Sequence, residues 1–157
     1  MLQLDAIDVR ILNVLQSNGR LTNVELAEHI NLSPSPCLRR VKLLEQAGYI
    51  CGYKAQLNAS MLGLGMTVFV DLKLSHHNDT ASDEFEAAIE RLNNVINCYL
   101  VSGSADYRLE IRVNDLQGYE SMLRKIQSLP HVKDIQSNFV IRSVKSESPM
   151  PIAVNRT

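Results

Sequence analysis

Four polar side chains recur at helical spacing between residues 33 and 47, and together they have the chemistry of a surface that reads DNA. Ser35, Arg39, Lys42 and Gln46 follow one another at i, i+4, i+7 and i+11, which is one side of an α-helix. We call these four residues the outer stripe. Arginine binds guanine bidentately, glutamine reads adenine and lysine neutralises phosphate, and no acid interrupts the stripe. The pattern predicts a helix that lies in the major groove.

The alternative is an ordinary amphipathic helix whose cationic side faces water. The opposite side of the segment carries Cys37, Val41 and Leu44, with Leu38 at its edge, as in any helix that packs on a domain. The turn spacing before the helix and the lack of acid in the outer stripe favour DNA recognition.

The preceding residues supply the turn that positions this helix. Thr22 and Glu25 form a Thr-x-x-Glu capping box that starts a shorter helix. Asn31 tolerates the left-handed conformation of a tight turn, and Ser33 then caps the second helix with Pro34 in its first turn. The residues expected to contact DNA are Thr22, Ser33, Ser35, Pro36, Arg39, Arg40, Lys42 and Gln46.

An earlier apolar repeat predicts one more helix, from Leu4 to Ser17, with Asp5 as its cap. Three helices in residues 1–50 predict a winged-helix-like helix-turn-helix domain. Residues 51–62 are expected to form a short strand or an extended linker. From residue 63 to 145 the pattern changes to alternating strands and two amphipathic helices, and residues 146–157 are expected to be a mobile tail.

The order of these later elements is β-α-β-β-α-β, so the chain belongs to the α+β class with a ferredoxin-like second domain. Strands are expected at 66–74, 95–101, 107–113 and 135–141, and helices at 85–92 and 115–129. Two helices cover one face of such a sheet. Phe69, Tyr99 and Val140 are apolar candidates for the other face, which predicts dimerisation through it.

The segment between the second and third strands has residues that suit a small zwitterion. Gly103 allows a close backbone approach, loop N–H groups bind an anion and Asp106 takes a cation, as a free amino acid would require. The alternative is a hairpin turn with Gly and Asp in conformational roles, and residue types alone favour that alternative.

Composition limits the remaining possibilities. The 157 residues carry a net charge of −1, and residues 1–50 have five cations and five acids. DNA affinity is therefore expected to come from the placement of charge and from several copies of the domain. No membrane span or signal peptide is apparent, so a cytoplasmic, nucleoid-associated location is expected.

No enzyme centre, cofactor or metal site is expected. Cys37, Cys51 and Cys98 lack metal spacing and are interpreted as reduced thiols. The pair His76 and His77, with Asp79 nearby, is only a weak metal candidate.

Three segments resemble the Lrp/AsnC family of transcription regulators, and the middle one is most similar to its leucine-responsive branch. They read LDAIDVRILNVLQSNGR, LSPSPCLRRVKLLEQAGYICGY and YLVSGSADYRLEIRV, within a resemblance that covers about residues 4–145. The family has a Gly-x-x-Asp-Tyr effector loop, which falls on Gly103, Asp106 and Tyr107. One departure is Asn31, where relatives often have Gly; both tolerate the turn.

The resemblance implies dimers that assemble into octamers and amino acids that bind between dimers. Its effector positions correspond to Gly103, Ser104, Ala105, Asp106, Tyr107, Leu116, Phe139, Val140 and Ile141. The apolar members of this set, with Asp106 as the only acid, favour leucine or methionine as the effector.

The sequence therefore predicts a sequence-specific DNA-binding regulator that responds to a free amino acid. Two rival hypotheses remain. One is an amino-acid-sensing protein that assembles with other regulators without reading DNA, and the other is a small ferredoxin-like enzyme fused to a helical module.

Overall fold

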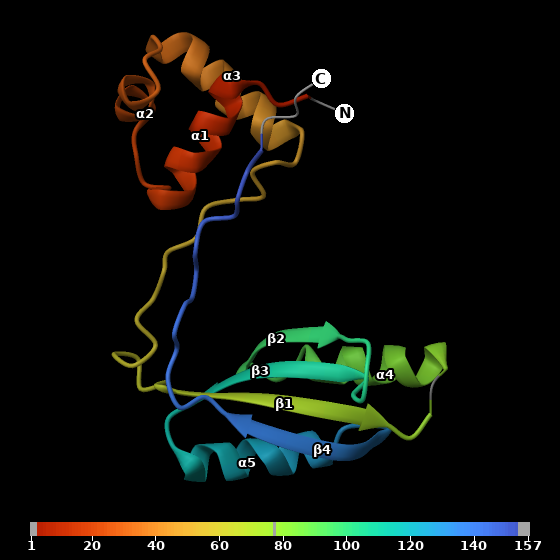
Figure 1. Ribbon diagram of the computed structural model, residues 1–157. Helices are drawn as coiled ribbons and strands as arrows, with labels where there is room; N and C mark the ends of the chain where they lie inside the picture. Colours follow the sequence, from red (N-terminus) through yellow and green to blue (C-terminus); the bar gives the residue numbers. More distant parts are fainter. Residues whose placement is uncertain (1–2, 77, 154–157) are drawn as a thin grey trace. The chain divides into compact units, whose positions relative to one another are not determined.

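The computed structural model describes residues 3–76 and 78–153 (Figure 1). The chain divides into two compact units. The helical unit comprises the described residues of 1–56 and 145–157, and the sheet unit comprises those of 57–144. Each unit has its own hydrophobic core.

The helical unit contains α1 (Ala6–Ser17), α2 (Asn23–His29) and α3 (Pro34–Gln46). The predicted caps are present: Asp5 caps α1, and Thr22 forms a capping box with Glu25 at the start of α2. Asn31 has φ 56° in the turn, as its residue type predicts. The buried side chains that hold the three helices together are Ile11, Leu12, Leu26, Ala27, Ile30, Cys37 and Leu44.

Part of the C-terminal tail, which the sequence pattern predicted to be mobile, contacts the helical unit. The side-chain amide of Gln16 donates to the Met150 carbonyl at 3.1 Å and accepts from the Met150 N–H at 2.7 Å. Ile152 packs against the core of the unit. The sequence pattern missed this contact because it consists of one apolar side chain and two hydrogen bonds between the Gln16 side chain and the Met150 backbone.

The sheet unit has the predicted β-α-β-β-α-β order. Its elements are β1 (Met66–Leu74), α4 (Asp79–Ile89), β2 (Val95–Leu100), β3 (Tyr107–Val113), α5 (Leu116–Gln127) and β4 (Val132–Phe139). All pairs are antiparallel, in the order β2-β3-β1-β4. The last strand begins and ends earlier than predicted, so Val140 and Ile141 follow it.

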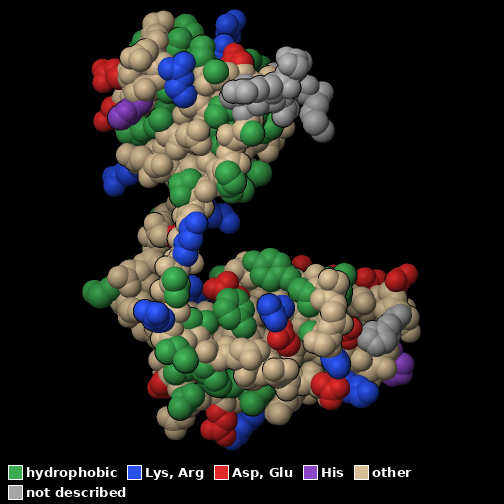
Figure 2. All heavy atoms as spheres, viewed as in Figure 1, with side chains coloured by type: hydrophobic (Ala, Val, Ile, Leu, Met, Phe, Trp, Pro, Cys, Tyr) green, Lys and Arg blue, Asp and Glu red, His purple; other side chains and the backbone are tan. Residues whose placement is uncertain are grey.

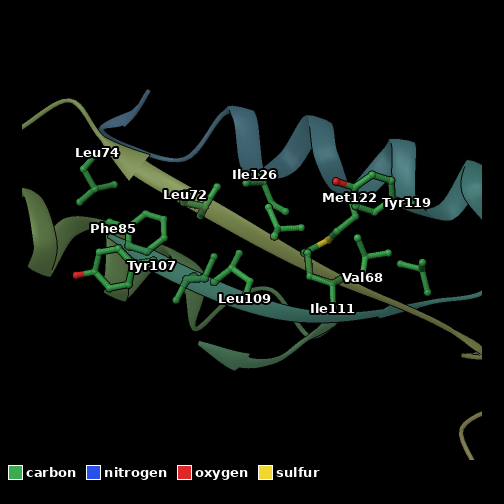
Figure 3. Close-up of a cluster of buried hydrophobic side chains, with 13 residues drawn as sticks. Val68, Leu72, Leu74, Phe85, Tyr107, Leu109, Ile111, Tyr119, Met122 and Ile126 are labelled. Carbon is green, nitrogen blue, oxygen red and sulfur yellow. The ribbon is translucent and has the colours of Figure 1, made fainter. Parts of the chain in front are cut away.

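One face of the sheet packs against α4 and α5 (Figures 1 and 3). Alternate residues of β1 and β3 point into this core, among them Val68, Leu72 and Leu109, which are fully buried. Figure 3 shows Phe85 of α4 beside Tyr107 of β3, with ring centroids 4.6 Å apart.

The opposite face of the sheet carries the outward residues of the same strands. Phe69 alternates with the buried Val68 and Val70, and it lies on this open face as predicted. Tyr99 opposes Arg108 there and is half-exposed. Figure 2 shows hydrophobic side chains exposed among charged ones on the visible surface of this unit. The open face is therefore amphipathic.

Candidate DNA interface and effector loop

The helix-turn-helix is held by its own backbone and by one side-chain bridge. The Leu32 N–H donates to the Ala27 carbonyl at 2.9 Å and closes the turn between α2 and α3. The amide of Asn23, at the start of α2, donates to the Pro34 carbonyl at 2.8 Å. These contacts fix the first turn of α3 relative to α2.

The outer stripe lies on the exposed side of α3. Ser35, Arg39, Lys42 and Gln46 are all exposed and line one shallow groove of about 410 Å³ together with Leu38 and Leu43. Within the described part of the chain, no ion pair engages Arg39 or Lys42. Two cations are thus presented without a neutralising acid.

Arg40 has a different role from the one expected for it. Its guanidinium Nη1 lies 2.8 Å from Asp5 Oδ2 and 2.7 Å from Asp8 Oδ1, so it joins α3 to the start of α1. The hydrogen bond to Asp8 is the largest of the effects that raise the pKa of Arg40. Because this side chain is used inside the unit, we withdraw it from the predicted DNA contacts.

The other expected DNA contacts lie at the starts of α2 and α3. The Thr22 hydroxyl donates to Glu25 Oε2 at 2.8 Å and accepts from the Glu25 N–H, so it is used by the capping box. Ser33 is the N-cap of α3, but its side chain makes no capping hydrogen bond. Pro36 lies in the first turn and is half-buried. Of these, Ser33 presents an exposed hydroxyl near the start of α3, where Ser35 supplies the one backbone N–H of residues 34–36, because Pro34 and Pro36 have none.

The loop between β2 and β3 is ordered by Asp106. Its carboxylate Oδ2 accepts the Leu74 N–H at 2.8 Å, and its backbone N–H donates to the Leu72 carbonyl at 2.8 Å. The Val101 N–H donates to the Asp106 carbonyl at 2.9 Å, while Gly103 adopts φ 113°, which favours glycine. The loop therefore holds a fixed shape against the end of β1.

Two depressions flank this loop. One, of about 300 Å³, is lined by Asp71, Lys73, Ser104, Ala105, Asp134, Ile135 and Gln136. The other, of about 460 Å³, is lined by Asp71, Val101, Ser102, Ser104, Ala105 and Arg108. Of the predicted effector residues, Ser104 and Ala105 line both depressions. Lys73 and Gln136 were not predicted, although their outward positions on β1 and β4 are the available sequence signal.

Asp71 and Arg108 form a bidentate ion pair between these depressions. The Asp71 carboxylate oxygens lie 2.7 and 2.9 Å from Nε and Nη2 of Arg108, and Asn138 donates to the same carboxylate at 3.4 Å. The hydrogen bond from Arg108 lowers the pKa of Asp71. The pair follows from the strand register, which sequence alone did not provide: Asp71 opposes Arg108.

The structure separates the other predicted effector residues from the loop. Phe139 pairs with Val68, and Leu116 follows the far end of β3, whereas the loop precedes Tyr107. The six residue steps from Tyr107 to Val113 correspond to about 20 Å along the strand. Leu116 is 64% exposed, and Val140 and Ile141, which follow β4, lie at the same far end. One protomer thus presents two sets of predicted residues at opposite ends of its sheet.

Tyr107 is the clearest correction among the effector residues. It is buried, and its hydroxyl donates to Glu86 Oε1 at 2.7 Å. Strand alternation directs residue 107 into the core, so its ring packs on Phe85 and is not presented on the surface at the loop.

The histidines and cysteines are the remaining candidates from the sequence. Among the described residues, no cluster of three or more His, Cys, Asp or Glu side chains is placed to hold a metal; His77 lies outside the described residues. His131 Nε2 lies 2.7 Å from Glu84 Oε2, and burial raises the pKa of the Cys98 thiol to about 11. In residues 3–76 and 78–153, no helix is long and apolar enough to cross a membrane.

Comparison with known proteins identifies relatives over nearly the whole chain. Residues 4–50 match a family model described as winged helix-turn-helix DNA-binding, and residues 67–150 match the Lrp/AsnC ligand binding domain. The leucine-responsive regulatory protein of Haemophilus influenzae is 43% identical over 143 residues, 90% of this chain and 86% of that protein. The Escherichia coli K12 protein of the same name is 41% identical over 150 residues, covering 95% and 92%.

Solved structures agree with the fold. A transcriptional regulator from Neisseria meningitidis, crystallised as an L-methionine complex, superimposes with a TM-score of 0.90 at 39% identity, covering 95% of this chain and 97% of that one. An AsnC family regulator from Agrobacterium tumefaciens gives a TM-score of 0.88 at 29% identity, covering 94% of this chain and 97% of that one.

Proposed function

The chain belongs to the Lrp/AsnC family, and on this premise we propose that it is a sequence-specific DNA-binding transcriptional regulator whose assembly or DNA binding responds to a free amino acid. The observation that carries the proposal is the acid-free outer stripe on an α3 that is fixed by a helix-turn-helix. A cytoplasmic location follows from such a role.

In this proposal the residues of the outer stripe contact different parts of the DNA. Arg39 and Gln46 are suited to base edges, and Lys42 to a phosphate. The exposed hydroxyls of Ser33 and Ser35 lie at the start of α3, where the helix dipole favours a phosphate and the Ser35 N–H is the one backbone donor of residues 34–36. Arg40 is excluded because Asp5 and Asp8 hold its guanidinium.

Lys42→Ala tests the phosphate role. The variant is expected to bind every duplex more weakly, and the slope of log affinity against log salt concentration should become shallower by about 1 for each helix bound. Fluorescence anisotropy over a salt series measures both. Arg10→Ala, which removes an exposed cation from α1, is the control and should retain the wild-type slope. A Lys42→Ala slope equal to wild type would remove the phosphate contact from the proposal.

The effector is proposed to be leucine or methionine, bound where two copies of the chain meet. An amino acid is too short to touch both the loop and the Leu116–Phe139 end of one sheet, about 20 Å apart. A site containing both sets therefore needs a second copy. The names of the leucine-responsive relatives and the L-methionine complex of the Neisseria meningitidis regulator support these two amino acids.

At the loop, the amino acid is proposed to bind through its charged ends. Backbone N–H groups of the loop hold the carboxylate, with Lys73 near by in the smaller depression. Asp106 holds the ammonium group or orders the loop that does so. A basic effector side chain is disfavoured, because its charge would be buried among Leu116, Phe139 and Ile141 without an acid. Asp71 and Asp134 lie at the loop end instead, and Asp71 is already paired with Arg108.

The open face of the sheet is proposed to form the dimer, and dimers are proposed to assemble into octamers. Two-fold dimers place two α3 helices about one DNA turn apart, or a multiple of it. Multivalent binding then offsets the weak net charge of the chain.

A fragment of residues 57–144 tests the dimer. Because the sheet unit has its own core, the fragment is expected to fold and to be at least dimeric at micromolar concentration by light scattering. Tyr99→Lys, which puts a charge on the open face, should shift it towards monomer. A folded fragment that is monomeric without this substitution would refute dimerisation through the sheet.

A further inference from the structure

Two exposed leucines border the outer stripe of α3. The side chains of Leu38 and Leu43 are 43% and 45% exposed and line the same groove as the outer stripe. At 100° per residue they lie about 140° apart around the helix, with the polar residues between them. The groove on α3 is therefore apolar at both edges and cationic in the middle.

Neither leucine belongs to the buried core that holds α3 in its unit. The packing side of the helix is formed by Cys37 and Leu44, both fully buried, and by the partly buried Val41. Leu38 and Leu43 do not take part in that core. A bound partner that covered them would gain the free energy of burying their remaining apolar surface.

Leu38 has the better position for contact with a base. It is the fifth residue of α3, and the N-terminal residues of a recognition helix are those that reach base edges. Among the groups on the base edges of the major groove, the C5-methyl of thymine is the one apolar group, and it accepts contact from apolar side chains.

We propose that Leu38 is a specificity-determining residue that reads a thymine methyl group beside the base bound by Arg39. The inference rests on the proposed function, in which the outer stripe lies in the major groove. Duplex DNA offers phosphates for Lys42 and a methyl for Leu38 within one groove. A protein partner would instead have to supply acids opposite Arg39 and Lys42 as well as an apolar surface.

The test removes single methyl groups from DNA. The full-length protein first selects its preferred duplex from a random pool, and each thymine of that duplex is then replaced by deoxyuridine. Wild type is expected to lose affinity about fourfold at one thymine in each half-site, which is the effect of burying one methyl group. Leu38→Ala should bind the thymine and uracil duplexes equally. Leu43→Ala, of similar exposure, should retain the fourfold difference at that position.

The outcomes separate this inference from the proposed function. If no uracil replacement weakens wild-type binding, or if the loss persists in Leu38→Ala, the thymine contact is refuted. If Arg39→Ala still loses base discrimination in that case, α3 remains in the groove and only the role of Leu38 fails. If Arg39→Ala and Leu38→Ala both bind as wild type, the proposed orientation of α3 fails as well. Circular dichroism checks that both variants are folded.

Discussion

Arg40→Met is expected to destabilise the helical unit by about 2–3 kcal/mol. The substitution leaves Asp8, which is 6% exposed, without its cation 2.7 Å away, and it removes the link between α3 and α1. The expected value lies at or below the low end of the range for a broken buried ion pair, because the Arg40 side chain is 28% exposed. Hydrogen exchange at the amides of α1 and α3 measures the change in opening free energy.

Two further variants show whether the ion pair is the cause. Arg39→Met removes the neighbouring cation, which has no ion pair in the described structure, and should change stability by less than about 0.5 kcal/mol. Asp8→Asn added to Arg40→Met should recover part of the loss, because the buried charge is gone. An Arg40→Met protein of unchanged stability and lowered DNA affinity would return Arg40 to the DNA interface.

Asp106→Ala is expected to abolish the response to leucine or methionine while DNA affinity in the absence of amino acid stays unchanged. The substitution removes the carboxylate that accepts the Leu74 N–H and so loosens the loop. The residues proposed to bind DNA belong to the other unit. Calorimetry with each amino acid, followed by anisotropy on the preferred duplex, measures the two properties.

Asp106→Asn distinguishes an electrostatic role from a structural one. Asparagine retains an acceptor for the Leu74 N–H but has no charge. If Asp106→Asn binds the amino acid at least tenfold more weakly than wild type, the ammonium group contacts the Asp106 carboxylate. If it binds with wild-type affinity, Asp106 acts by ordering the loop. Asp83→Asn, an exposed acid on α4, is the control. Wild-type affinity for the amino acid in both Asp106 variants would contradict any role for this residue. Tight binding of lysine or aspartate, with no binding of leucine or methionine, would contradict the proposed specificity.

The fold and the helix-turn-helix were predictable because their signals are local. Thr22 and Glu25 cap α2 through side chains three residues apart, and Asn31 takes the left-handed conformation that its short polar side chain tolerates. The alternation in residues 66–74 and 107–113 reports directly which side chains face α4 and α5.

The site was less predictable because its contacts join distant residues. Nothing in the sequence around Arg40 indicates that its partners are Asp5 and Asp8, more than thirty residues away. Two signals conflict at Tyr107. Strand alternation predicts a core position, whereas the family resemblance predicts a position at the effector. In the structure Tyr107 is buried and its hydroxyl donates to Glu86. A site that needs a second copy, as proposed for Leu116 and Phe139, leaves no pattern in one chain.

The central claim is that the outer stripe of α3 reads bases, and the most direct test compares Arg39→Ala with wild type on the preferred duplex and on its single-base-pair variants. We expect Arg39→Ala to lose about 1–3 kcal/mol on the preferred duplex and to discriminate less at one position of each half-site. Arg10→Ala, which changes the net charge equally, should bind as wild type. Unchanged affinity of Arg39→Ala at moderate salt, or an equal loss on every duplex, would contradict the claim.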